Sequence, residues 1–142
     1  MEMLAQQWMN PRPLTVTPGT MLAEAKAIME KYWVRHLLVV EGDALVGMLS
    51  DRDVRMASLP PGPGYTDAER EARLARVAVR DAMTRDPRTV GPDALLVDVA
   101  RLMLEHRFGG VPVVGGGRLV GILTETDILR AFIKMVEGDR AP

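Results

Sequence analysis

Two short segments of the sequence carry a hydroxyl and a carboxylate at the same spacing. Each has a glycine, a hydroxyl residue three positions later and an aspartate three positions after that: Gly47, Ser50 and Asp53 in one, and Gly121, Thr124 and Asp127 in the other. A helix N-terminus attracts phosphate, an aspartate can accept hydrogen bonds from two neighbouring ribose hydroxyls, and a glycine lets a ligand approach the backbone closely. The pattern is therefore suited to holding a nucleotide.

The same residues also have a purely structural interpretation. Each hydroxyl stands where an expected strand passes into an expected helix, so its oxygen can accept hydrogen bonds from the first-turn N–H groups. The aspartate can complete a capping box and lie at the positive end of the helix. Because such a cap contributes about 1 kcal/mol, helix capping alone could account for the repeated pattern.

Little else in the sequence supports catalysis. No serine forms a nucleophile-elbow pattern, and no glycine-rich loop leads into a helix with a lysine. The glycine run at 115–117 lies between two apolar segments, where we expect a hairpin turn rather than a phosphate loop. Cysteine is absent and His36 and His106 are the two histidines, which argues against thiolate catalysis and an imidazole-rich metal centre. We therefore expect no enzymatic activity, no catalytic residues, no metal and no required cofactor.

The composition is that of an ordinary globular chain. Its 142 residues are 47% hydrophobic and 26% charged, and the formal net charge is -1. A net charge this close to zero gives no broad attraction to nucleic acid or anionic lipid. No segment has the ~18 apolar residues that would span a bilayer, and residues 1–10 lack the pattern of a signal peptide. We expect a cytoplasmic protein without a membrane partner.

The two segments are parts of a longer repeat. When Met9 is aligned with Met83, the copies superimpose without a gap, and most aligned positions keep their apolar or polar character. We place the first copy at residues 9–58, a Pro/Gly-rich linker with a charged helix at 59–81, and the second copy at 82–137. Two copies of one unit tend to pack about a pseudo-twofold axis, which creates related clefts where they meet.

Each copy is expected to form a strand, a helix, a hairpin and a second helix, giving an α/β (α+β) fold of two β-α-β-β-α repeats. In the first copy, Leu14–Thr17 is the short strand, and Thr20 is placed to cap the next helix. The expected apolar faces of this helix and its counterpart are Leu22, Ala25, Met29 and Tyr32, and Leu96, Val99, Met103 and His106. The hairpin strands at 37–49 and 111–123 are apolar at nearly every position, so both sheet faces should be covered.

Two further helices are distinguished by their surfaces. Thr66 has the spacing of a capping box and should open a charged helix that ends near Arg76. Because the faces of this helix are largely arginine and glutamate, we expect a solvated spacer. The last helix, at 125–137, is apolar over a wider arc than one buried face requires. We favour self-association as the cover for this surface, and cover by the linker helix or by Trp8 is the alternative.

On these motifs the sequence resembles a tandem pair of CBS (cystathionine beta-synthase) domains, a Bateman module. The resemblance rests on Thr-Val-x-Pro at 15–18 and 89–92, on the hairpin starts at 35–37 and 110–114, and on the glycine–hydroxyl–aspartate pattern. In that family these motifs bind the ribose, phosphate and base of adenosine compounds. The resemblance implies ribose and phosphate contacts at Ser50, Arg52, Asp53, Thr124 and Asp127, adenine contacts at Thr15, Leu37, Thr89 and Val111, and candidate phosphate contacts at Arg35 and His36.

The two copies differ in charge around these positions. The first has Arg35, His36 and Arg52 where the second has Gly109, Gly110 and Thr126, and the second also carries Glu125. Arginine forms charge-assisted hydrogen bonds with phosphate, whereas a glutamate repels it. We therefore expect one dominant site, in the copy that contains Asp53. A structural role is the alternative for His36, and Leu38 differs from its counterpart Pro112, which could alter the base pocket.

These expectations describe a stand-alone regulatory module for energy sensing. An adenosine nucleotide or derivative, such as AMP, ADP, ATP or S-adenosylmethionine, would bind in the cleft between the repeats, and its level would be relayed to an unknown regulated protein. We expect a homodimer that associates through helices. The alternatives are a ligand-free interaction or dimerisation scaffold of the same fold and, with less support, a nucleic acid-binding member of the family.

Overall fold

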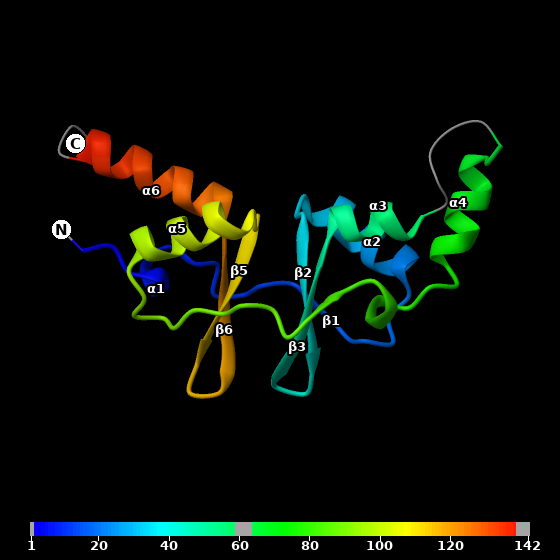
Figure 1. Ribbon diagram of the computed structural model, residues 1–142, viewed down its shortest axis with the longest axis horizontal. Helices are drawn as coiled ribbons and strands as arrows, with labels where there is room; N and C mark the ends of the chain where they lie inside the picture. Colours follow the sequence, from blue (N-terminus) through cyan, green and yellow to red (C-terminus); the bar gives the residue numbers. More distant parts are fainter. Residues whose placement is uncertain (1, 59–63, 139–142) are drawn as a thin grey trace. The chain divides into compact units, whose positions relative to one another are not determined.

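The computed structural model describes residues 2–58 and 64–138, which form two compact units (Figure 1). One unit is Leu14–Pro87, and the other combines Met1–Pro13 with Arg88–Pro142. Each unit contains an antiparallel hairpin that leads into a helix, so the predicted mixed α+β fold is confirmed. Residues 59–63 of the predicted linker lie outside the described residues.

The Leu14–Pro87 unit is built on a four-stranded sheet in the order β1-β2-β3-β4. These strands are β1 (Thr15–Val16), parallel to β2 (His36–Glu41), then β3 (Ala44–Ser50), antiparallel to both β2 and β4 (Thr84–Arg85). The helices are α2 (Leu22–Tyr32), α3 (Asp51–Ala57) and α4 (Asp67–Leu74), with a 3-10 turn at Val79–Asp81. In Figure 1, α2 and α3 lie toward the end of the hairpin where β3 enters α3, and the β2–β3 turn projects from the other end.

The second unit repeats this arrangement with weaker outer strands. It contains α1 (Ala5–Trp8), α5 (Leu96–His106), β5 (Gly110–Gly115), β6 (Arg118–Thr124) and α6 (Glu125–Glu137). Isolated bridges replace the outer strands: Val90 pairs parallel with Val113, and Asn10 pairs antiparallel with Ile122. Asn10 therefore holds the same place beside β6 that Thr84 holds beside β3.

The predicted apolar faces of α2 and α5 are buried except in their last turns. The buried members are Leu22, Ala25 and Met29 on α2, and Leu96, Val99 and Met103 on α5. Tyr32 is instead 52% exposed, and the exposed His106 stacks on Phe108. The next residue in each copy, Trp33 or Arg107, adopts the left-handed conformation that ends the helix. In each copy the backbone turns away here, so the core does not cover the last predicted position of the helix.

The predicted cap at Thr20 is wrong. The N-cap of α2 is Met21, which makes no side-chain capping bond, and the Thr20 hydroxyl instead accepts a hydrogen bond from Thr17 N–H at 3.2 Å. The helix is anchored at its start by a distant segment, because Leu22 N–H donates to the Val77 carbonyl at 2.8 Å. A tertiary hydrogen bond thus replaces the local cap that the sequence suggested.

The charged helix α4 is not a solvated spacer. Its N-terminus forms as predicted, since Thr66 accepts from Glu69 N–H at 3.1 Å. Its last residue, Leu74, is only 2% exposed and packs in the core of the Leu14–Pro87 unit. Lys26 on α2 also donates to Glu71 Oε1 at 2.6 Å, and this bond raises the pKa of Lys26. Leu74 and the Lys26–Glu71 ion pair therefore help to dock a helix whose remaining surface is largely polar.

α6 has the predicted bounds and keeps a broad apolar surface. Five of its apolar side chains are between 52% and 61% exposed: Leu129, Phe132, Ile133, Met135 and Val136. Trp8 lines a hollow of about 300 Å³ together with Ile133, so it covers only part of that surface. The intramolecular cover that was the alternative to self-association is thus incomplete.

Candidate functional site

In the first copy, Ser50 and Asp53 bond to each other where β3 passes into α3. Ser50 N–H donates to Asp53 Oδ2 at 2.8 Å, and Asp53 N–H donates to Ser50 Oγ at 3.1 Å. The predicted capping box is therefore confirmed here. Asp53 is half-buried, and within residues 2–58 and 64–138 its Oδ1 atom has no hydrogen-bond or ion-pair partner. Oδ1 and the Ser50 hydroxyl proton are both available to a ligand.

The start of β2 lies beside this capping box. His36 is directly opposite Ser50 across the strand pair, and Asp51 N–H donates to the Arg35 carbonyl at 2.9 Å. The side chains of Arg35 and Arg52 are exposed. The structure thus brings the predicted phosphate contacts of the first copy to the same end of the hairpin as Ser50.

The predicted adenine contacts of the first copy lie close to His36 in the sheet, with Leu37 next to it on β2 and Thr15 on the neighbouring strand β1. Thr15 is exposed on β1 and is paired with Leu38, the neighbour of Leu37. The Leu37 side chain is fully buried in the core, and so is that of Val111 in the second copy. Neither side chain is therefore exposed to a base. Thr89, the counterpart of Thr15, is also exposed.

The second copy holds its aspartate differently. Thr124 N–H donates to Asp127 Oδ2 at 2.8 Å, and the Thr124 hydroxyl donates to the same oxygen at 3.3 Å. The other oxygen, Oδ1, accepts from Arg130 Nη2 at 2.6 Å. Asp127 is 4% exposed. Both carboxylate oxygens of Asp127 are therefore engaged within the unit.

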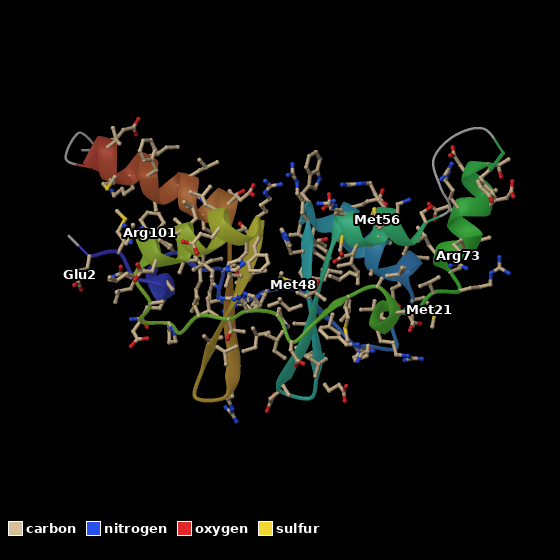
Figure 2. All side chains as sticks on the ribbon, viewed as in Figure 1. Glu2, Met21, Met48, Met56, Arg73 and Arg101 are labelled. Atoms are coloured by element: carbon tan, nitrogen blue, oxygen red, sulfur yellow. The ribbon has the colours of Figure 1, made fainter. Side chains whose placement is uncertain are left out.

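Arg130, which the sequence analysis did not single out, is a direct partner of the predicted site residue Asp127. Its counterpart in the first copy is Met56, which is 75% exposed on α3 (Figure 2). A signal was present in the sequence, because residues three apart face each other on a helix and Arg130 follows Asp127 by three positions.

The exchange of Leu38 for Pro112 has a clear structural effect. Leu38 N–H donates to the Leu14 carbonyl at 3.1 Å, which extends the pairing between β1 and β2. Proline has no N–H to donate. In the second copy the corresponding pairing is reduced to the bridge around Val90, which donates to the Pro112 carbonyl at 3.1 Å. The two copies therefore differ next to the predicted adenine contacts.

The glycines of the two motifs allow another segment of the same unit to pack closely against the strand. A Cβ atom on Gly47 would lie 2.5 Å from Met83 Sδ and 3.0 Å from the Thr84 carbonyl oxygen. A Cβ atom on Gly121 would lie 2.5 Å from Met9 Sδ and 2.8 Å from the Asn10 carbonyl oxygen. The predicted role of these buried glycines, to let a ligand approach the backbone closely, is therefore wrong. The approaching group is the segment that begins at Met9 or Met83.

Two hollows of the described residues lie beside the helices that follow the motifs, and Arg130 lines one of them. One of about 300 Å³ is lined by residues such as Trp8 and Ile133, and one of about 330 Å³ lies between α4 and residues such as Lys26 and Arg55. Neither is lined by Asp53 or Asp127. The described residues contain no group of three histidine, cysteine or acidic side chains arranged to hold a metal ion. Nor does that part of the chain contain a helix of the length and apolar character needed to cross a membrane.

Comparison with known proteins decides the family. A family model for the CBS domain matches the chain twice, at residues 5–60 and 79–134. The chain belongs to the CBS domain family. Because the match occurs twice and solved CBS pairs share the fold, the predicted tandem CBS pair is confirmed.

Three relatives of this CBS pair cover almost its whole length. A CBS domain-containing protein of Dictyostelium discoideum is 32% identical over 96% of this chain and 96% of its own. Arabidopsis thaliana CBSX2, solved in complex with AMP, is 30% identical with a TM-score of 0.80 and covers 93% of this chain and 97% of that chain. A CBS domain pair solved with 5′-methylthioadenosine and S-adenosyl-L-methionine is 27% identical with a TM-score of 0.78, over 95% of this chain and 99% of that chain.

Proposed function

We propose that this CBS pair is a non-enzymatic regulatory module that binds an adenosine nucleotide or derivative and relays its level to a partner protein. The observation that carries the proposal is the half-buried Asp53 carboxylate, whose Oδ1 atom has no partner among the described residues. Two similar structures were solved with AMP or with S-adenosyl-L-methionine and 5′-methylthioadenosine, which supports an adenosine compound as the ligand.

In the proposed site, Asp53 accepts hydrogen bonds from the ribose hydroxyls through Oδ1. Ser50 donates its hydroxyl proton to a ribose or phosphate oxygen. His36 lies on β2 directly opposite Ser50, Arg35 precedes it, and Arg52 is on α3. Arginine side chains at these positions favour the binding of a phosphate. The exposed Thr15 and the Leu37 backbone contact the base. The motif that contains Asp53 is the dominant site, and Thr89, Val111, Thr124 and Asp127 form the weaker one.

The relay needs a difference in affinity between two arrangements of the protein. A ligand shifts a conformational equilibrium only as far as it prefers one state over the other. A partner that reads this shift would in turn change the affinity for the ligand by the same factor. We place the repeats that respond at residues 9–58 and 82–137, joined by 59–81, in a homodimer formed through α6.

The decisive experiment uses titration calorimetry to measure the binding of AMP, ATP and S-adenosylmethionine to the Asp53→Asn variant. A hydrogen bond to a charged group contributes about 1.5–3 kcal/mol, so the affinity should fall about 10- to 100-fold. Asp51→Asn is the matched control, because Asp51 lies in the same turn and its carboxylate pairs with Arg55 at 3.0 Å. That control should bind like the wild type.

A ligand-free scaffold is the second candidate, and the capping box favours it because Ser50 and Asp53 satisfy each other without a ligand. For a scaffold, Asp53→Asn would cost about 1 kcal/mol of stability through the weakened cap. The wild type would then show neither heat of binding nor a thermal shift with any of the three ligands. That result would exclude the sensing function and leave the scaffold.

A further inference from the structure

Both oxygens of the Asp127 carboxylate accept hydrogen bonds from donors of its own unit. Three hydrogen bonds reach it, two from Thr124 at 2.8 and 3.3 Å and one from Arg130 at 2.6 Å. A carboxylate has about four acceptor positions in total. The bond from Arg130 is charge-assisted and therefore of the stronger kind. A pair of ribose hydroxyls at Asp127 would have to displace at least one of these donors.

Among the described residues, the carboxylate of Asp53 receives one hydrogen bond, from Ser50 N–H at 2.8 Å. The position that corresponds to Arg130 is Met56, whose thioether cannot donate a hydrogen bond. Met56 is exposed, so the space beside Asp53 is not filled by a packed core residue. The same motif is thus open in one copy and closed in the other. Two bonds make the difference, the longer one from the Thr124 hydroxyl to Oδ2 and the shorter, charge-assisted one from Arg130 to Oδ1.

We propose that Arg130 is a specificity-determining residue that closes the second motif by pairing with Asp127 and so directs an adenosine ligand to the motif of Asp53. This inference rests on the proposed function. It gives a reason, independent of the charge of the phosphate, for the expected dominance of the first site. A ligand without phosphate should therefore show the same preference as AMP.

The test exchanges the two side chains between the copies. Arg130→Met gives the second motif the residue of the first, and Met56→Arg does the reverse. In the full chain, AMP and adenosine are titrated by calorimetry, and the backbone amides of Ser50 and Thr124 are followed by NMR. The wild type should bind about one ligand per chain, and the amide of Ser50 should shift rather than that of Thr124.

In Arg130→Met, the Thr124 amide should also shift, and the affinity of the second motif should rise at least about tenfold because Asp127 regains a free acceptor. In Met56→Arg, the affinity of the first motif should fall at least about tenfold, while Met56→Gln, which adds polarity without the cation, should leave it unchanged. If Arg130→Met does not fold, the test uses Arg130→Gln together with Met56→Arg and Met56→Gln.

Two kinds of failure are distinguishable. If the wild type binds neither AMP nor adenosine, the proposed function is wrong, and the inference that depends on it is wrong as well. If the wild type binds at Asp53 but Arg130→Met still shows one site and Met56→Arg binds as well as Met56→Gln, the role of Arg130 alone is overturned. Tighter AMP binding in Met56→Arg would also overturn it, because the added arginine would then be a phosphate contact.

Discussion

Gly47 and Gly121 show how one residue can satisfy two hypotheses in the sequence. A glycine before a hydroxyl and an aspartate fits close approach by a ligand, but it equally fits close approach by another part of the chain. The structure decides for the chain, since methionine side chains and backbone carbonyls occupy the space beside both glycines. The hydroxyl and the aspartate keep their proposed role without the help of the glycine.

We predict that Gly121→Ala destabilises the protein by about 1–3 kcal/mol, because the new methyl group would overlap Met9 Sδ and the Asn10 carbonyl oxygen. Gly19→Ala is the control, since its methyl group would meet only the tip of Arg80 at 3.7 Å. That control should change the free energy of unfolding by less than about 0.5 kcal/mol. Urea denaturation measures both variants, and equal stability would contradict the packing role of Gly121.

Among the elements, α4 shows that the polarity of a helix does not decide whether it docks. Its arginines and glutamates suggested a spacer in solvent, yet the buried Leu74 and the bond from Lys26 to Glu71 attach it to α2 and the core. An exposed ion pair contributes about 0–1 kcal/mol, so Leu74 must supply most of the docking energy. One apolar side chain is enough because the rest of the helix can remain in water.

Leu74→Ala is therefore expected to lower the free energy of unfolding by about 2–5 kcal/mol. Leu104→Ala provides the same chemical change at a side chain that is 81% exposed on α5, and should stay within about 0.5 kcal/mol of the wild type. Thermal and urea unfolding give both values. If the two variants lost the same stability, α4 would not be docked through Leu74 in solution.

For the whole molecule, the exposed apolar surface of α6 is the feature that favours a second copy. Five neighbouring apolar side chains at 52–61% exposure are unusual for a helix that faces only water. Self-association removes this surface from water without requiring any other partner. The hydrophobic contribution scales with the apolar area that is buried, so a single charge within the contact should break it.

We expect light scattering with size-exclusion chromatography to show a dimer for the wild type and a monomer for Phe132→Glu. Burying an unpaired carboxylate in an apolar contact costs more than such an interface can supply. Arg118→Glu is the control, because Arg118 is exposed in the β5–β6 hairpin and lies on a different surface element. A dimeric Phe132→Glu variant, or a wild type that stays monomeric at high concentration, would contradict association through α6.

The local parts of this fold could be predicted from the sequence. The repeat, the β-α-β-β-α order, the capping box at Ser50 and Asp53 and the bounds of α6 all follow from residues that lie a few positions apart. Hydrophobic periodicity and i to i+3 hydrogen bonds are local, so a linear sequence displays them directly. The family resemblance rested on the same local motifs and was confirmed.

The tertiary structure alone decided which surfaces those elements meet. Met9 packs against Gly121, Val77 anchors the start of α2, and Leu74 enters a core formed by distant residues. These contacts join positions far apart in the chain, so no local pattern contains them. The bond that closes Asp127 is different, because Arg130 is near in sequence but its rotamer and the burial of its partner depend on the packed unit. Spacing shows that two side chains can meet, and only packing determines that they do.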